Sequence, residues 1–226
     1  MRSNSATTGK NGARGASRRA RRSDAILASA VAAFGRHGYH GSSMREIADT
    51  LARTKGSLYY YFGSKEDILF AAHDRALDHM LEVLARVETD DRDPEWQLRQ
   101  LVVEHTHAMV DGFHGTALAL ELDALTPARR RRVVAKRDRF EKGLRRIIER
   151  GVRLGTFRPL DARLAGFALL GSINWTARWY RPGGVFAAGE LGEVYADLFL
   201  GGLRRDAAGG RARRAPRVPH SAPEEI

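Results

Sequence analysis

The sequence predicts an all-α protein with an N-terminal three-helix domain and a larger C-terminal helical domain. Between the ends of the 226-residue chain, apolar residues recur at helical spacing, and no stretch alternates convincingly over the length of a strand. The chain is long enough to bury a sizeable core, and it has no cysteine for disulfides or thiolate metal sites. No apolar run approaches the roughly 20 residues of a membrane span, and the N-terminus lacks the apolar core of a signal peptide. We therefore expect a cytoplasmic protein with no membrane partner.

The net charge of +11 is concentrated at the two ends of the chain. Residues 1–22 carry seven Lys and Arg and no acid, and residues 204–226 carry six Arg against three acids. Both segments are rich in small and polar residues, so we expect a disordered basic arm at the start and a disordered basic tail at the end. Such segments either aid solubility or bind a polyanion such as nucleic acid, and both roles fit the composition.

The first predicted helix spans residues 23–37. Ile26, Ala30 and Phe34 lie on its apolar stripe, and Ser23 is a suitable N-cap. Several glycines follow between residues 35 and 41, where we expect the helix to end.

Two short helices follow and complete a first domain at residues 23–66. Ser43 and Glu46 have the spacing of a capping box, in which each side chain satisfies a backbone N–H at the start of the second helix. The third helix begins at Thr54, whose hydroxyl is a suitable cap, and ends near Gly63.

The second predicted domain covers residues 67–203. Its first helix is capped by Ser64 and Asp67, and it is long enough to link the two domains. The remaining predicted helices cover residues 95–113, 116–125, 128–153, 161–181 and 187–203.

The second and third helices are joined by the short connection "ARTK", which is typical of a helix-turn-helix whose second helix enters the DNA major groove. Small polar residues at the start of that helix allow the backbone to approach the duplex, and free N–H groups there bind phosphate. Lys55 and Ser57 would then face the bases. Three consecutive tyrosines, 59–61, point in three directions, so we expect at least one to pack inward and the others to offer hydroxyls to phosphates.

The segment "SSMREIADTLARTKGSLYYYFGSKEDIL", preceded by "AAFGRHGY", resembles the N-terminal DNA-binding domain of the TetR/AcrR family of bacterial repressors. The resemblance covers about 45 residues and departs from the family in the turn, where Ala52 and Arg53 replace the usual Gly and β-branched residue. It implies base contacts by Arg45, Lys55 and Ser57. It implies phosphate contacts by Ser43, Thr54, Tyr59, Tyr60, Tyr61 and Lys65.

Several of these residues have a second explanation. Ser43 and Thr54 are equally suited to act only as helix caps, and Tyr59 or Tyr61 is the candidate to pack in the core. Lys65 has the position of an ordinary surface lysine.

The C-terminal half contains "LRRIIERGVRLGTFRP", "NWTARWYRPGG" and "YADLFLGGL", and it resembles TetR-type repressors that sense acyl-coenzyme A thioesters and control fatty-acid or steroid-ring catabolism. This resemblance implies an apolar effector, an acyl-CoA or another small molecule, as partner. Apolar and polar side chains near residue 174 suit such a ligand. The candidate ligand-binding residues are Phe167, Leu170, Asn174, Trp175, Arg178 and Trp179, with Arg181 nearby. Both tryptophans also suit the core or a subunit interface.

The helix at 161–181 is apolar nearly all round, and the helix at 187–203 carries an apolar stripe that includes Leu191, Val194 and Leu198. A helix that is apolar on all sides needs partners on all sides. We therefore expect these two helices to form a homodimer interface.

No catalytic motif is present in residues 90–203, and we expect neither an enzyme nor a cofactor. His107, Asp111 and His114 share one helical face and form a weak candidate metal site, while His105 lies on another face and receives no role. The function predicted is a ligand-responsive repressor that binds a pseudo-palindromic operator as a dimer. The alternative is an architectural protein that binds DNA of any sequence through its basic tails.

Overall fold

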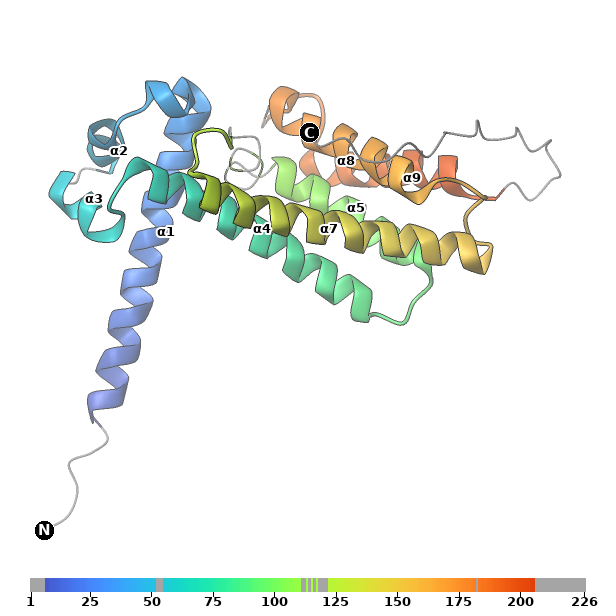
Figure 1. Cartoon of the computed structure of the whole chain (residues 1–226), viewed down its shortest axis with the longest axis horizontal. Coiled ribbons are helices and arrows are strands. Elements are labelled where there is room, and N and C mark those ends of the chain that lie inside the picture. Colours follow the sequence, from blue (N-terminus) through green and yellow to red (C-terminus); the bar gives the residue numbers. More distant parts are fainter. Residues whose placement is uncertain are drawn as a thin grey trace, which may run out of the picture.

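The computed structural model describes residues 7–51, 55–110, 113, 115, 117, 122–181 and 183–205. Within these residues the chain forms eight α-helices and no strand, so the predicted all-α fold class is confirmed (Figure 1). None of the described helices combines the length and apolar character that crossing a membrane requires.

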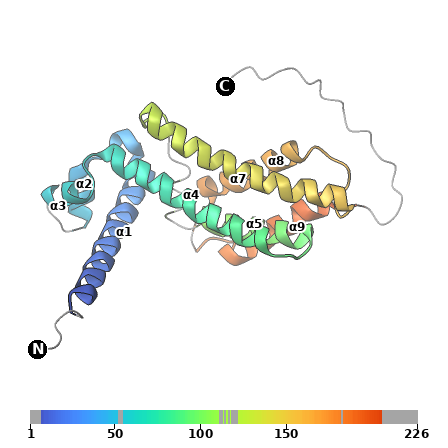
Figure 2. The same ribbon diagram turned by 60° about the horizontal axis from the view of Figure 1, so that its bottom comes forward.

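Helix α1 (Thr7–Gly41) begins earlier than predicted. The expected disorder of residues 1–22 gives way to helix from Thr7 onward, because this segment is rich in Ala and Arg, which are strong helix formers. Its N-terminal part projects away from the rest of the molecule (Figures 1 and 2). Gly38, at φ 72° and ψ 164°, interrupts the helix next to the end that the sequence predicts at residue 37.

Helices α2 (Met44–Thr50) and α3 (Lys55–Tyr61) pack with the second half of α1. Phe34 of α1, Ile47 of α2 and Leu58 of α3 are at most 1% exposed and belong to one core. The turn with Ala52 and Arg53 lies outside the described residues. The three helices therefore form the predicted N-terminal bundle around a small apolar core.

Helix α4 (Lys65–Thr89) takes part in both cores of the molecule. The Ser64 hydroxyl accepts a hydrogen bond from the Asp67 N–H at 3.1 Å, as the capping motif predicts. Ile68 and Leu69 belong to the N-terminal core, whereas Val83 and Leu84 belong to the C-terminal core. One continuous helix therefore joins the N-terminal bundle to the larger domain.

The larger domain is built around α5 (Pro94–Val110), which packs against α4, α7 (Pro127–Leu154), α8 (Ala162–Trp179) and α9 (Ala188–Leu203). These boundaries lie within a few residues of the predicted ones. The helix expected at 116–125 lies mostly outside the described residues, and residues 122–125 form turns and bends instead of its end.

Helix α7 crosses α4 and is held there by salt bridges as well as apolar contacts (Figures 1 and 2). Near the N-terminal bundle, Arg129 pairs with Glu66 and Asp67 of α4. In the middle, Lys136 Nζ lies 2.6 Å from Asp74 Oδ1 and 2.7 Å from Asp78 Oδ1. Farther along, Arg146 pairs with Glu88 at 2.6 Å. The sequence did not reveal these pairs, since their members lie about 60 positions apart.

The close approach of α7 to α4 also depends on Gly143. A Cβ atom at this position would lie 2.2 Å from Cδ2 of Leu84, which is buried. We expect Gly143→Ala to lower the free energy of unfolding by about 1–3 kcal/mol, because the buried leucine must move. Urea unfolding measures this change. Gly56→Ala is the matched control, because a Cβ there would meet nothing within 4 Å; equal destabilisation by both variants would contradict the packing described.

Candidate functional site

The N-terminal bundle presents α2 and α3 on an outer surface of the molecule (Figure 1). Ser43 caps α2, and its Oγ accepts the Glu46 N–H at 3.1 Å. Arg45 projects into solvent with its side chain 84% exposed and makes only a weak surface pair with Asp49 at 3.8 Å. The first turn of α2 therefore carries a cation that is accessible to a partner.

The three tyrosines of α3 divide between surface and core. Tyr60 is 67% exposed and Tyr59 is 44% exposed, while Tyr61 is half-buried and packs against the N-terminal core. The ring of Tyr60 lies 5.3 Å from the guanidinium carbon of Arg19 on α1. Tyr59 and Tyr60 therefore point outward, as expected for phosphate contacts. Tyr61 is the tyrosine that packs inward, although its side chain is only partly buried.

Gly56 lies on the same exposed side, in the first turn of α3. Glycine costs a helix about 1 kcal/mol relative to alanine. Packing does not explain the choice of glycine, because a Cβ atom added at this position would meet nothing within 4 Å. A bare backbone on an exposed helix start suits the close approach of another molecule.

Lys65 has a role within the protein. Its Nζ donates hydrogen bonds to the Tyr39 carbonyl at 2.7 Å and the Ser42 carbonyl at 2.8 Å, and it lies 4.3 Å from the centre of the Tyr39 ring. Desolvation lowers the pKa of Lys65. An ammonium group has three protons, so these bonds leave one for an outside partner. Lys65 thus ties the end of α1 to the start of α4.

The remaining predicted DNA contacts are less well defined. Thr54 lies outside the described residues, as does the side chain of Lys55, although Lys55 begins α3. Ser57 is half-buried in the first turn of the same helix.

A cavity of about 150 Å³ lies in the larger domain, where α4, α5, α7 and α8 meet. Each helix contributes two lining residues. They are Leu77 and Met80, His105 and Met109, Arg137 and Phe140, and Leu170 and Asn174. The cavity is mostly apolar, with three polar side chains.

His105 is the most deeply placed of these polar side chains. It is 4% exposed, and its Nε2 lies 2.8 Å from Asn174 Oδ1. An amide oxygen only accepts, so Nε2 carries the proton and Nδ1 is an acceptor. Burial lowers the pKa of His105 to about 4 and keeps the ring neutral. Nδ1 is buried and has no hydrogen-bond partner among the described residues.

Arg137 is the only permanent cation that lines the cavity within the described residues. Burial lowers the pKa of its guanidinium. His73 of α4 is fully buried, and burial together with the charge of Arg137 lowers the pKa of His73 to about 4. The neutral imidazoles of His73 and His105 and the guanidinium of Arg137 therefore belong to the same region of the larger domain.

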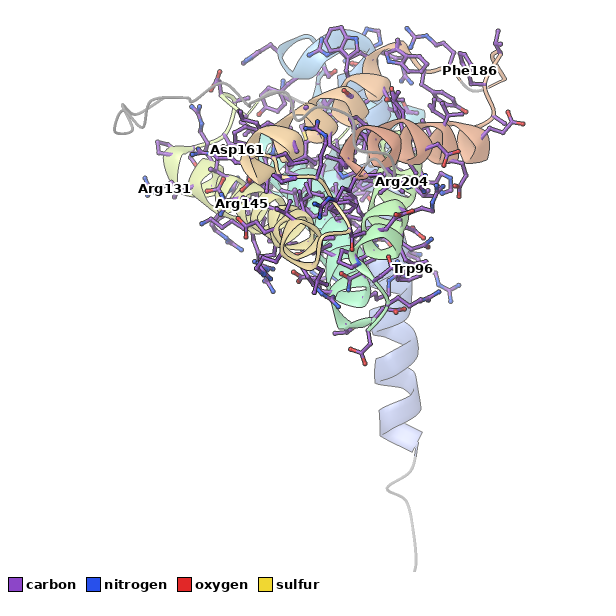
Figure 3. The ribbon with its side chains drawn as sticks, turned by 90° about the vertical axis from the view of Figure 1, so that its right-hand side faces the viewer. Trp96, Arg131, Arg145, Asp161, Phe186 and Arg204 are labelled. Carbon is purple, nitrogen blue, oxygen red and sulfur yellow. The ribbon has the colours of Figure 1, made fainter. Side chains whose placement is uncertain are left out.

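Arg137 and Leu170 also line a second hollow of about 480 Å³ between α7 and α8. We call this hollow the groove. Its other lining residues are Asp138, Glu141, Lys142, Arg145, Arg163 and Phe167. Arg145 and Arg163 also line a third hollow of about 460 Å³ at the start of α8, near Asp161. Figure 3 labels Arg145 and Asp161. The cavity and the groove are therefore adjoining spaces, one apolar and one rich in cations.

The predicted ligand-binding residues of α8 fall on two sides of the helix. Leu170 and Asn174 line the cavity, and Phe167 lines the groove. Trp175 is 62% exposed and Trp179 is 39% exposed, and Arg178 is also exposed. These three residues line none of the hollows described above.

Three residues that line the cavity were not among the candidates predicted from the sequence: His105, Arg137 and Phe140. His105 lies four positions after Leu101 and four before Met109, on the buried stripe of α5, and this spacing was a signal that it faces inward. His107 is exposed on another face of α5, and Asp111 and His114 lie outside the described residues. The candidate metal site therefore lies mostly outside the described residues, and the described residues contain no group of His, Asp and Glu side chains that could hold a metal ion.

Exposed apolar side chains gather on the outer side of α8 and α9 and in the loop between them. Phe186 of that loop is 53% exposed and lies at the edge of the molecule in Figure 3. The other members are Leu164, Trp175, Trp179, Val185, Val194 and Leu198. We call this set the α8–α9 face. So many large apolar side chains on one face are unusual for a surface that contacts only water.

The sequence matches two protein families, one in each domain. "Bacterial regulatory proteins, tetR family" matches residues 26–72, which include α2 and α3. "Tetracyclin repressor-like, C-terminal domain" matches residues 91–203, which include α5 and α7 to α9. The resemblance seen in the sequence is therefore confirmed over both domains.

Individual proteins give the same result. The transcriptional repressor KstR2 of Rhodococcus jostii is 30% identical over 203 residues, which cover 87% of this chain and 94% of KstR2. The crystal structure of the TetR family regulator PfmR of Thermus thermophilus is 37% identical, with a TM-score of 0.72 over 80% of this chain and 99% of PfmR. AibR, in complex with isovaleryl coenzyme A and operator DNA, is 29% identical, with a TM-score of 0.69 over 81% of this chain and 98% of AibR.

A substitution at Gly56 is predicted to change the stability of the protein and its affinity for DNA in opposite directions. Gly56→Ala adds a methyl group in open space on a helix, so we expect the free energy of unfolding to rise by about 1 kcal/mol. The same methyl group should weaken DNA binding, because it blocks close approach of the duplex. Thermal unfolding and fluorescence anisotropy with labelled DNA measure the two effects. Unchanged or tighter DNA binding would show that this side of α3 does not face the duplex.

Proposed function

The chain belongs to the tetR family of bacterial regulatory proteins, and on that premise we propose that it is a repressor that a coenzyme A thioester releases from DNA. It binds a pseudo-palindromic operator as a homodimer. The observation that carries the effector assignment is the apolar cavity that adjoins a groove rich in cations.

In this proposal α3 enters the major groove of the operator, and α2 supports it against the backbone. Arg45, Lys55 and Ser57 contact base edges. The phosphates are bound by Ser43, Thr54, Tyr59, Tyr60, Tyr61 and Lys65. The exposure of Arg45 and Tyr60 and the bare backbone at Gly56 support this orientation. Lys65 has one proton to give, since two carbonyls take the others.

The second subunit covers the α8–α9 face. Two copies of this face, related by a two-fold axis, bury the same apolar side chains against each other and form a four-helix interface. Two of its members, Trp175 and Leu198, are each more than 60% exposed in the single chain. Trp175, Arg178 and Trp179 then act at this interface, one of the roles that the sequence left open for the tryptophans.

A coenzyme A thioester has two chemically different ends, and so do the adjoining hollows. Its acyl group is apolar and suits the cavity, while its phosphates are anionic and suit the groove. The groove is lined by Arg137, Lys142, Arg145 and Arg163 against two carboxylates, Asp138 and Glu141. AibR, a related structure, contains isovaleryl coenzyme A together with operator DNA.

The homodimer gives the next prediction. Leu198→Glu places a charge on the α8–α9 face, so we expect monomers at micromolar concentration and loss of operator binding, because one half-site alone binds weakly. Sedimentation velocity and operator anisotropy measure both. Val134→Glu is the control, since Val134 is exposed on α7 and is not a member of the face. A dimer that survives Leu198→Glu contradicts the proposed interface.

The effector assignment is tested by release from the operator. Operators are identified by genome-wide binding with purified protein, and sequence-independent coating of DNA would favour an architectural protein instead. On a confirmed operator, the matching thioester should weaken DNA binding about 5- to 150-fold, and the operator should weaken thioester binding equally. The double variant Lys142→Gln and Arg163→Gln should need at least tenfold more thioester, because charged hydrogen bonds to phosphate are lost.

Arg139→Gln is the matched control for that variant, because Arg139 is exposed on the same helix and lines none of the three hollows. Release by thioesters that is insensitive to the double variant would place the phosphates elsewhere. No release by any coenzyme A thioester would refute the effector assignment and leave a tetR-family regulator of some other molecule.

A further inference from the structure

We propose that the effector's acyl group is small, about the size of a six-membered ring, and carries an oxygen that forms a hydrogen bond with His105. This inference rests on the proposed function and names the class of thioester that the cavity selects. Two features carry it: the volume of the cavity, and the presence among its lining residues of His105, whose buried Nδ1 has no hydrogen-bond partner among the described residues.

The volume limits the acyl group. A cavity of about 150 Å³ is the size of an apolar protein cavity that holds one benzene molecule. Met80, Met109 and Phe140 line it, are at most 5% exposed and belong to the C-terminal core, so enlarging the cavity requires the core to repack. A long fatty acyl chain would therefore leave most of its length in the charged groove. A single ring or a short branched chain fits without that cost.

The polar wall determines the chemistry of the acyl group. Nδ1 of His105 is a buried acceptor without a partner among the described residues, and a hydrocarbon placed against it would keep it unpaired. A hydroxyl group on the acyl moiety donates to this nitrogen. If the Asn174 amide is turned over, Nδ1 becomes the donor and a keto oxygen is the matching group. In either arrangement an oxygen on the acyl group would give Nδ1 its missing partner.

The thioester oxygen does not fill this role in our assignment. Arg137 lines both the cavity and the groove, so it lies where an acyl group in the cavity would join its coenzyme A. Its guanidinium donates to the thioester oxygen there. His105 lines the cavity and not the groove, so in this assignment it contacts the acyl group itself.

The test compares thioesters that differ only in the acyl group. Cyclohexanecarbonyl coenzyme A, the set of its ring-hydroxylated and ring-oxo isomers, and hexadecanoyl coenzyme A are titrated against the operator complex, with release followed by anisotropy. We expect at least one oxygenated isomer to release the protein at about tenfold lower concentration than the unsubstituted ring, because a buried polar group gains its partner. Hexadecanoyl coenzyme A should be weaker than either ring compound.

The role of His105 is tested in the same assay. His105→Phe removes the acceptor and should erase the preference for the oxygenated ring, while His107→Phe, on the exposed side of α5, should keep it. Equal release by oxygenated and unsubstituted rings, or stronger release by hexadecanoyl coenzyme A, overturns the inference in the unmodified protein, whether or not the variant folds. In either case release itself still supports the proposed function. Failure of every thioester to release the protein refutes the proposed function and this inference with it.

Discussion

The contact between α4 and α7 is the interaction on which the rest of the structure depends. Helix α4 contributes Ile68 and Leu69 to the N-terminal core and Val83 and Leu84 to the C-terminal core, so it cannot move without disturbing both. Helix α7 fixes its position through apolar packing and through the salt bridges of Arg129, Lys136 and Arg146. Individual pairs of this kind contribute little, but their spacing along the crossing defines one relative position of the two helices.

The cavity lies on this contact, since α4 and α7 each supply two of its lining residues. Arg137 of the cavity is adjacent in sequence to Lys136, which pairs with α4. A ligand that displaces Arg137 therefore acts close to the bonds that hold α4. Helix α8 has a related double role, because its inner side lines the cavity and its outer side belongs to the α8–α9 face. The proposed ligand site is thus connected in space to both the N-terminal bundle and the proposed dimer interface.

Features that depend on neighbouring residues were predictable from the sequence. The caps at Ser43 and Ser64, the break near Gly38 and the apolar stripes gave most helices within a few residues. Features that depend on tertiary packing were not. The side that each α8 residue faces, the pairing of α4 with α7 and the burial of His105 are set by contacts between distant segments. The tryptophans were expected near the ligand because they are apolar, yet apolar residues suit a cavity and a subunit interface equally well.

The most direct test of the proposed mechanism is the distance between the two N-terminal bundles of the proposed dimer. The chain has no cysteine, so a single Arg36→Cys substitution on the exposed side of α1 accepts one spin label in each subunit. Double electron–electron resonance then gives the distance between the two labels with operator bound and with thioester bound. The account predicts two different distance distributions, because the ligand moves α4 and the bundle that it carries. The same distribution in both states, with the thioester bound at saturation, would contradict it.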